Sequence, residues 1–194
     1  MSQKSRLFIA SSIQELSGRQ AGETLETVYA QRETIGARTG KRVKWVPPDQ
    51  WHLTWLFLGA VEHEAIEPIK ADLTEALSVV KPVPAELEEV VFWPKPRKAN
   101  LIVCRLKHDP KLLRVWDALC KGLPAYPADK AFKPHITLAR LKEEQTRPQN
   151  QKTPWGFSPL EPSSWLIDSV TLYQSLLTPA GPVYTPLHRV SLTP

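Results

Sequence analysis

Two short runs of this chain repeat one order of polar and apolar residues. Residues 51–59 read WHLTWLFLG and residues 134–141 read PHITLARL, so each contains a His, an aliphatic residue, a Thr and another apolar residue. Side chains of a β-strand alternate between its two faces. We therefore expect each run to be a strand whose His and Thr share one face. The opposite, buried face of the first strand would be formed by Leu53, Trp55 and Phe57.

The presence of two copies of the pattern is stronger evidence for a functional site than either copy alone. The chain holds five histidines, and a single His near a Thr is most often an ordinary polar pair on a half-buried sheet. Two copies in the same order argue against that interpretation for His52 with Thr54 and for His135 with Thr137. The remaining histidines, which lack a Thr two residues later and are expected to be ordinary surface side chains, are His63, His108 and His188.

Two His–Thr pairs that met across a groove would suit a displacement at phosphorus. Unperturbed imidazoles have a pKa near 6.5, so at neutral pH one ring can accept a proton while the other donates one. Hydroxyl groups and an imidazolium can donate hydrogen bonds to the oxygens of a phosphate group between them. The chain has no Asp/Glu cluster and no His/Cys spacing typical of a metal site. We therefore expect neither a metal nor another cofactor.

Composition limits the setting in which such a site would work. The 194 residues predict a single domain spanning 1–194, and no apolar stretch is long enough to cross a membrane. Cys104 and Cys120 form no CxxC motif, so we expect reduced thiols, a cytoplasmic location and no membrane partner. The formal net charge of +5 favours an anionic partner, which is compatible with RNA.

Periodicity and turn signals outline the rest of the domain. The predicted order is β-α-β-α-β-β-α-β-β-β, an α+β fold with mainly antiparallel pairing. Asp109 and Pro110 suit the start of a helix, and Ser12 with Glu15 suits the start of an earlier one. The polar, proline-rich stretch 142–164 predicts a long loop. The predicted strands cover 5–11, 51–59, 85–93, 99–106, 134–141, 163–177 and 182–192, and the predicted helices cover the residues after Ser12 into the thirties, 62–80 and 108–123.

The two motifs and their flanks resemble those of the two-histidine phosphoesterases, in particular the RNA 2′,3′-cyclic phosphodiesterases, also called 2′–5′ RNA ligases. The segments that carry the resemblance are RLFIAS (6–11), VKWVPPDQWHLTWLFLG (43–59), FKPHITLAR (132–140) and YQSLLTPAGPVYTPL (173–187). The resemblance implies two pseudo-symmetric lobes with mainly antiparallel sheets flanking a central groove, and helices on the outside. It also implies metal-independent hydrolysis of a terminal RNA 2′,3′-cyclic phosphate to a 2′-phosphomonoester, with reversible 2′–5′ ligation in some members.

The resemblance also implies roles for individual residues. By motif position, His52 and His135 are the expected acid/base pair, and Thr54 and Thr137 the expected phosphate binders. Arg140 matches a family arginine that helps to hold the nucleotide. Strict alternation would place Arg140 on the face opposite the second His, so this role requires the strand to end or bulge by residue 139; otherwise Arg140 only borders the groove. The first motif departs from the family at Trp55, where an aliphatic residue is more common.

Other interpretations of the same sequence stay open. The protein could be a non-catalytic module that binds RNA ends, or a related phosphodiesterase acting on small cyclic nucleotides; in each case we expect a monomer. Phe132 could stack on a base or pack in the core. Basic and aromatic groups in 38–44 and 93–98 could contact RNA or lie in solvated turns. These groups are Arg38, Lys41, Arg42 and Lys44 in the first segment, and Trp93, Lys95, Arg97 and Lys98 in the second.

Overall fold

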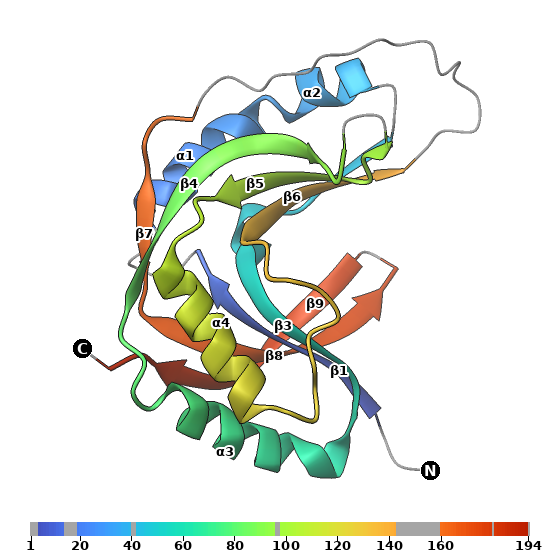
Figure 1. Cartoon of the computed structure of the whole chain (residues 1–194). Coiled ribbons are helices and arrows are strands. Elements are labelled where there is room, and N and C mark those ends of the chain that lie inside the picture. Colours follow the sequence, from blue (N-terminus) through green and yellow to red (C-terminus); the bar gives the residue numbers. More distant parts are fainter. Residues whose placement is uncertain are drawn as a thin grey trace.

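Antiparallel strand pairing organises most of the chain. The computed structural model describes residues 4–13, 19–39, 42–95, 98–142, 160–179 and 181–193. Within these ranges nine strands form one sheet in the order β7-β4-β5-β6-β3-β1-β8-β9, with β2 paired to β6 as well (Figure 1). The strands are β1 (Lys4–Ser12), β2 (Arg42–Trp45), β3 (His52–Glu62), β4 (Val83–Trp93), β5 (Leu101–Leu106), β6 (His135–Lys142), β7 (Ser164–Ile167), β8 (Ser169–Thr178) and β9 (Gly181–Ser191).

The sheet is curled, because a very short connection joins strands near its two ends. β7 pairs with β4 at one end of the order, whereas β8 pairs with β1 near the other end. In a flat sheet, six strand spacings of about 4.8 Å would separate β7 from β8 by roughly 29 Å. Only Asp168 lies between these two strands, and such a link spans at most about 7 Å. The sheet must therefore bend until the two strands meet, as Figure 1 shows.

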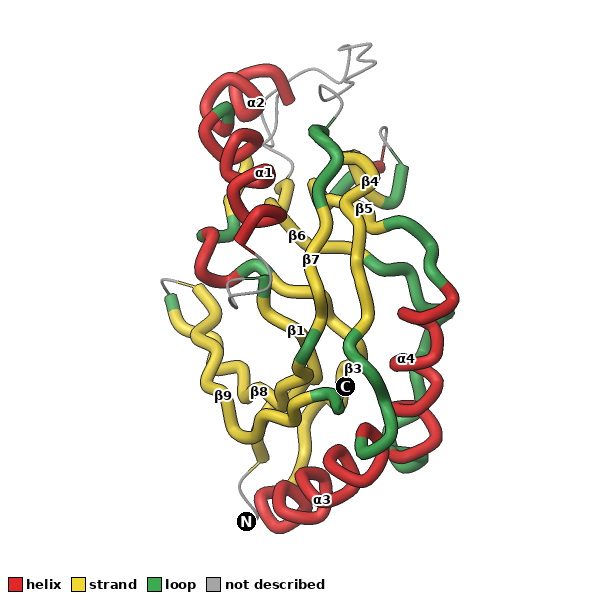
Figure 2. The backbone as a smooth tube through the Cα atoms, turned by 90° about the vertical axis from the view of Figure 1, so that its left-hand side faces the viewer, coloured by secondary structure: helices red, strands yellow, loops and turns green. Residues whose placement is uncertain are grey.

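Helices lie around the outside of the strands, which confirms the predicted α+β class (Figure 2). Asp109 caps α4, since its Oδ1 accepts a hydrogen bond of 2.7 Å from the backbone N–H of Lys111. No helix in the described ranges has an apolar run long enough to cross a lipid bilayer. The helices are α1 (Arg19–Ala30), α2 (Arg32–Thr39), α3 (Ile66–Leu77) and α4 (Pro110–Gly122), with short 3-10 helices η2 (Pro48–Gln50) and η3 (His63–Ala65).

The structure corrects several predicted elements. Ser12 is the last residue of β1, and the first described helix begins at Arg19; Glu15, the other half of the predicted capping pair, lies outside the described residues. The single strand expected over 163–177 is divided at Asp168 into β7 and β8. The short strand β2 was not predicted. Residues 143–159 of the expected loop lie outside the described residues.

Candidate functional site

The two motif strands are neighbours at the centre of the sheet. β3 and β6 run antiparallel, and Leu53 lies opposite Ile136. One step along each strand from this pair brings His52 opposite Thr137, and one step the other way brings Thr54 opposite His135. The two apolar partners are fully buried, while the polar members of both motifs are half-buried. The structure therefore brings the two His–Thr pairs together on one face of the sheet.

Both motif strands carry a β-bulge at the same place. In β3, Thr54 pairs with Ala10 and Leu56 pairs with Ile9, so Trp55 is the extra residue. In β6, Leu138 is the corresponding extra residue, between Thr137 and Ala139. The burial patterns of the first eight residues of the two strands are identical as a result.

The bulge reverses the alternation beyond it. Arg140 is consequently exposed on the same face as His135, which confirms the bulge that its expected position required. In β3 the equivalent residue is Phe57, whose side chain is 69% exposed. The prediction that Phe57 belongs to the buried face is therefore wrong, and Leu56 takes its place there. Alternation alone cannot reveal such a bulge.

The two imidazoles are held by the same local hydrogen bond. Nδ1 of His52 lies 2.7 Å from the carbonyl oxygen of Gln50, and Nδ1 of His135 lies 2.7 Å from the carbonyl oxygen of Lys133. A carbonyl oxygen only accepts, so Nδ1 must carry the proton in both rings. Nε2 is then the acceptor of each neutral ring, or the second donor of an imidazolium. Each Nε2 is thus left to exchange protons with a bound molecule.

Aromatic rings surround His52. Its imidazole lies 5.3 Å from the ring of Phe8 and 5.4 Å from the ring of Tyr184, which meets it edge-on. Burial lowers the pKa of His52 below its ordinary value of 6.5; the hydrogen bond to Gln50 opposes this shift, and the positive charges of His135 and Arg140 add to it. In the free protein His52 therefore favours its uncharged form.

The residues that line this side of the site were not predicted from the sequence. Phe8 stacks on Tyr173 at 5.3 Å, and Tyr184 contacts the same Phe8 ring at 5.0 Å. Burial raises the pKa of Tyr184, while the charges of Arg140 and Arg6 lower it. These side chains meet because β8 pairs with β9 and also with β1, and the second of these pairings is not indicated by the sequence.

His135 has a different neighbour. Its imidazole lies nearly parallel to the indole of Trp93, with 5.8 Å between ring centroids and 12° between planes. Lys133 Nζ lies 5.4 Å from the centre of the same indole. Trp93, one of the candidates from the 93–98 segment, is therefore in contact with a motif histidine.

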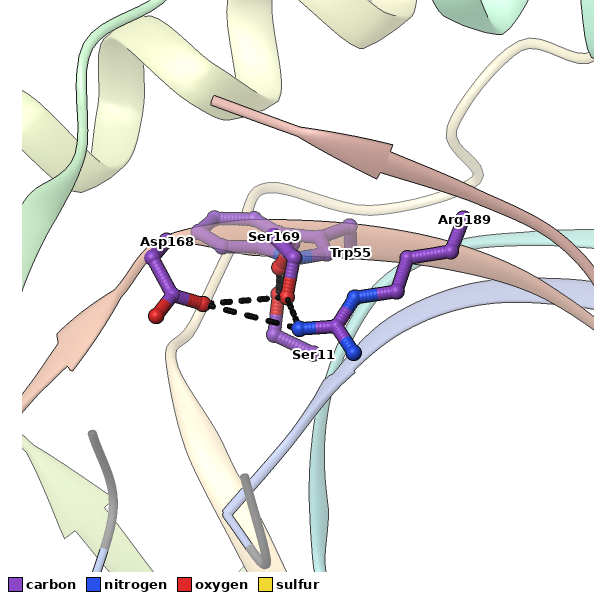
Figure 3. Close-up of polar contacts among 5 residues, drawn as sticks. All are labelled: Ser11, Trp55, Asp168, Ser169 and Arg189. Carbon is purple, nitrogen blue, oxygen red and sulfur yellow. Dashed lines mark hydrogen bonds and ion pairs between the residues drawn. The ribbon is translucent and has the colours of Figure 1, made fainter. Parts of the chain in front are cut away.

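The apolar face of β3 is anchored on the other side of the sheet. Trp55 donates a hydrogen bond of 2.9 Å from Nε1 to Ser11 Oγ, and this hydroxyl donates one of 2.6 Å to the carbonyl oxygen of Ser169 (Figure 3). The indole also stacks on Phe132 at 5.3 Å, and Phe132 stacks on Trp116 of α4. Phe132 therefore packs in the core, and Trp55, the extra residue of the bulge, is held on the face opposite His52 and Thr54.

The arrangement can perform acid/base chemistry on an anion. Two imidazoles with available Nε2 atoms, two hydroxyls and the guanidinium of Arg140 share one face of adjacent strands. Imidazoles can transfer protons, and hydroxyl and guanidinium groups can hold phosphate oxygens. Within the described ranges, no cluster of three or more His, Cys, Asp or Glu side chains could hold a metal ion.

Comparisons with known proteins point in the same direction. Residues 27–178 match the family model of the 2′–5′ RNA ligase superfamily. A protein from Aeropyrum pernix named RNA 2′,3′-cyclic phosphodiesterase is 30% identical over 165 residues, which cover 82% of this chain and 91% of the relative. One of the same name from Thermotoga maritima is 24% identical over 186 residues, covering 95% of this chain and 94% of the relative.

Solved structures share the fold. A crystal structure of a Thermus thermophilus protein superposes with a TM-score of 0.74 at 30% identity, covering 96% of this chain and 97% of that chain. The structure of E. coli LigT complexed with phosphate gives a TM-score of 0.72 at 23% identity, with 100% of both chains covered. At that identity the second similarity supports the fold alone.

Proposed function

Because this chain belongs to the 2′–5′ RNA ligase superfamily, we propose that it hydrolyses the terminal 2′,3′-cyclic phosphate of RNA to a 2′-phosphomonoester. The observation that carries the proposal is the antiparallel pairing of the two His-x-Thr strands, whose register places each His opposite the Thr of the other strand. Relatives named for this activity match over most of the chain, 95% of it in one case and 82% in another.

The proposed reaction is an in-line displacement. A water molecule attacks phosphorus and loses a proton to Nε2 of one imidazole; the bond from phosphorus to O3′ breaks, and the other imidazole protonates O3′. The product carries a 2′-phosphate and a free 3′-hydroxyl, and proton exchange with solvent restores both rings. Thr54, Thr137 and Arg140 hold the non-bridging oxygens, where negative charge increases in the transition state. If the 5′-hydroxyl of a second RNA end attacks phosphorus in place of water, the same breakage of the P–O3′ bond leaves a 2′–5′ linkage, and the reverse of that step cleaves it.

The two histidines start from different environments. Burial favours the uncharged form of His52 in the free protein. An anionic phosphate bound beside an imidazole raises the pKa of that imidazole and opposes the effect of burial. Which histidine accepts the proton and which donates it is therefore decided once substrate is bound, because the orientation of the substrate fixes the side from which water attacks phosphorus.

The proposal extends to how the protein works as a whole. We expect a monomeric, single-domain enzyme, since both motif strands come from one chain and lie in one continuous sheet. We also expect it to act in the cytoplasm. Sedimentation at assay concentrations tests the monomer. A dimer whose dissociation abolishes turnover would contradict it.

The direct test uses an oligoribonucleotide that ends in a 2′,3′-cyclic phosphate, incubated with the protein in the presence of EDTA. We expect conversion to a product heavier by one water, with the phosphate on O2′ as located by NMR. Tight binding without turnover would instead support an RNA end-binding module. Turnover confined to cyclic mononucleotides would support the small-nucleotide alternative, and a 3′-phosphate product would contradict the proposed geometry.

A further inference from the structure

A group of cations lies on the short ribbon formed by β2 and β6. Arg42 is directly opposite Lys142, and Lys44 is directly opposite Arg140. All four side chains are exposed. Residues directly opposite in an antiparallel pair share a face, so these four side chains project from the same face of the ribbon. We refer to Arg42, Lys44, Arg140 and Lys142 as the cationic ladder.

The ladder begins at the candidate active site. The bulge at Leu138 places Arg140 on the face of β6 that carries His135 and Thr137, and Lys142 follows two residues later on the same face. The positive charge of Arg140 acts to lower the pKa of His52 and of Tyr184, and the register of β6 places Arg140 on the same face as His135 and Thr137. The outer pair lies one further step along the ribbon, away from the site.

The turn between β8 and β9 also comes close to the ladder. A side chain added at Gly181 would place its Cβ 3.3 Å from Lys44 Nζ. Gly181 therefore leaves room for this ammonium group next to the hairpin that carries Tyr184. Of the two pairs, the inner one therefore lies near the start of β9.

The pairing within the ladder places like charges directly opposite each other. Like charges directly opposite each other in a sheet destabilise it. Elsewhere in the same sheet cations face acids: Arg105 is paired in register with Glu89 and forms an ion pair with it at 2.8 Å. In the ladder each cation instead faces another cation. An anionic partner that spans both pairs would relieve this repulsion.

We propose that the cationic ladder binds the phosphodiester backbone of the nucleotides that precede the terminal cyclic phosphate. The proposal rests on the proposed function, because the cyclic phosphate must occupy the two-histidine site for the preceding phosphates to reach β2 and β6. Successive ladder pairs are two residues apart, about 6.8 Å along the strand, which is comparable with the separation of successive phosphates in an extended single strand. The protein accordingly prefers oligonucleotide ends to cyclic mononucleotides, and this preference weakens as salt is added.

The test removes the outer pair and leaves the residues next to the site unchanged. In the double variant Arg42→Gln/Lys142→Gln we expect kcat/KM for a cyclic-phosphate oligoribonucleotide to fall about fivefold to tenfold at low salt. The dependence of log(kcat/KM) on log salt should become shallower by roughly 0.7 for each lost phosphate contact. Hydrolysis of a 2′,3′-cyclic mononucleotide should not change.

A matched control carries the same change in net charge. Lys111→Gln/Lys121→Gln alters two exposed lysines of α4, remote from β2, and should preserve oligonucleotide turnover. Equal losses in the two double variants, or equal kcat/KM of the unmodified protein on oligonucleotide and mononucleotide, would overturn the ladder while hydrolysis itself stands. If the unmodified protein hydrolyses neither substrate, it is the proposed function that fails. Thermal melts of both variants verify that they are folded.

Discussion

At the scale of single residues, the two motif histidines are oriented by the same hydrogen bond but are surrounded by different side chains. Each imidazole donates from Nδ1 to the carbonyl oxygen two residues earlier, which fixes its ring plane and leaves Nε2 available. His52 packs between Phe8 and Tyr184, whereas His135 stacks on Trp93. Two copies of one motif therefore differ in the side chains that contact their histidines. Such an asymmetry suits a reaction that needs one ring charged and the other uncharged.

The environment of His52 predicts its titration. Burial is the main cause that lowers the pKa of this imidazole below 6.5, so in the free protein it should gain its proton at a lower pH than in the urea-unfolded chain. As the pH falls through 6.5 the unfolded chain takes up this proton first, so the contribution of His52 to stability decreases toward acid pH. NMR titration, with the signal assigned by its loss in His52→Gln, measures the shift. A folded-state pKa of 6.5 or above would contradict this account.

At the scale of elements, the paired bulges decide what the motif strands present. Without the bulges at Trp55 and Leu138, Phe57 and Arg140 would face the core and the motif would provide only His and Thr. With them, each strand presents a third side chain to the same face. This third side chain differs between the two strands: it is the aromatic ring of Phe57 in β3 and the guanidinium of Arg140 in β6.

Alanine substitutions at the two residues that follow the bulge test it directly. Leu56→Ala should lower the free energy of unfolding by about 2–5 kcal/mol, because Leu56 is buried and its removal leaves a cavity. Phe57→Ala should cost less than about 1 kcal/mol, because its ring is 69% exposed. Urea denaturation measures both values. A regular strand without a bulge would reverse the order of the two effects.

Close packing of α3 against α4 makes a second prediction. A Cβ added at Gly122 of α4 would overlap the side chain of Ala76 in α3. Gly122→Ala should therefore destabilise the fold by about 1–3 kcal/mol. The matched control is Gly36→Ala in α2, where the nearest atom to the new Cβ is Val43 Cγ2 at 4.0 Å; it should be neutral or stabilising by up to about 1 kcal/mol. Equal stabilities of the two variants would show that the helices are not in this contact.

At the scale of the whole molecule, local signals predicted the elements better than their assembly. The helix after Asp109, the α3 stripe of Ile66, Ile69, Leu73 and Leu77, and both motif strands follow from periodicity and capping, which act within a few residues. The meeting of His52 with His135 could be expected only because the motif occurs twice. Trp93 was a candidate for RNA contact, but its stacking on His135 could not be predicted, and Phe8 and Tyr184 could not be assigned to the site. These contacts depend on pairing between strands that are far apart in the chain, β5 with β6 and β1 with β8.

The division at Asp168 shows the same limit. The run 163–177 looks like one long strand because it is rich in apolar residues and contains no Gly or Pro. The curl of the sheet requires a break there, and Asp168 is positioned beside Arg189 of β9, with 3.9 Å between Oδ1 and Nη2 (Figure 3). The position of this break depends on where the two ends of the sheet lie. The periodicity of residues within the run carries no information about that.

The central claim is that the two motif histidines form one acid/base pair, and their substitution tests it most directly. Turnover of a 2′,3′-cyclic phosphate oligoribonucleotide should fall by roughly 10²-fold or more in His52→Ala and in His135→Ala, while His63→Ala, which alters an exposed histidine of η3, should retain full activity. Because the two rings act in one step, the double variant should lose little beyond the worse single variant. Wild-type turnover in either folded single variant would contradict the account.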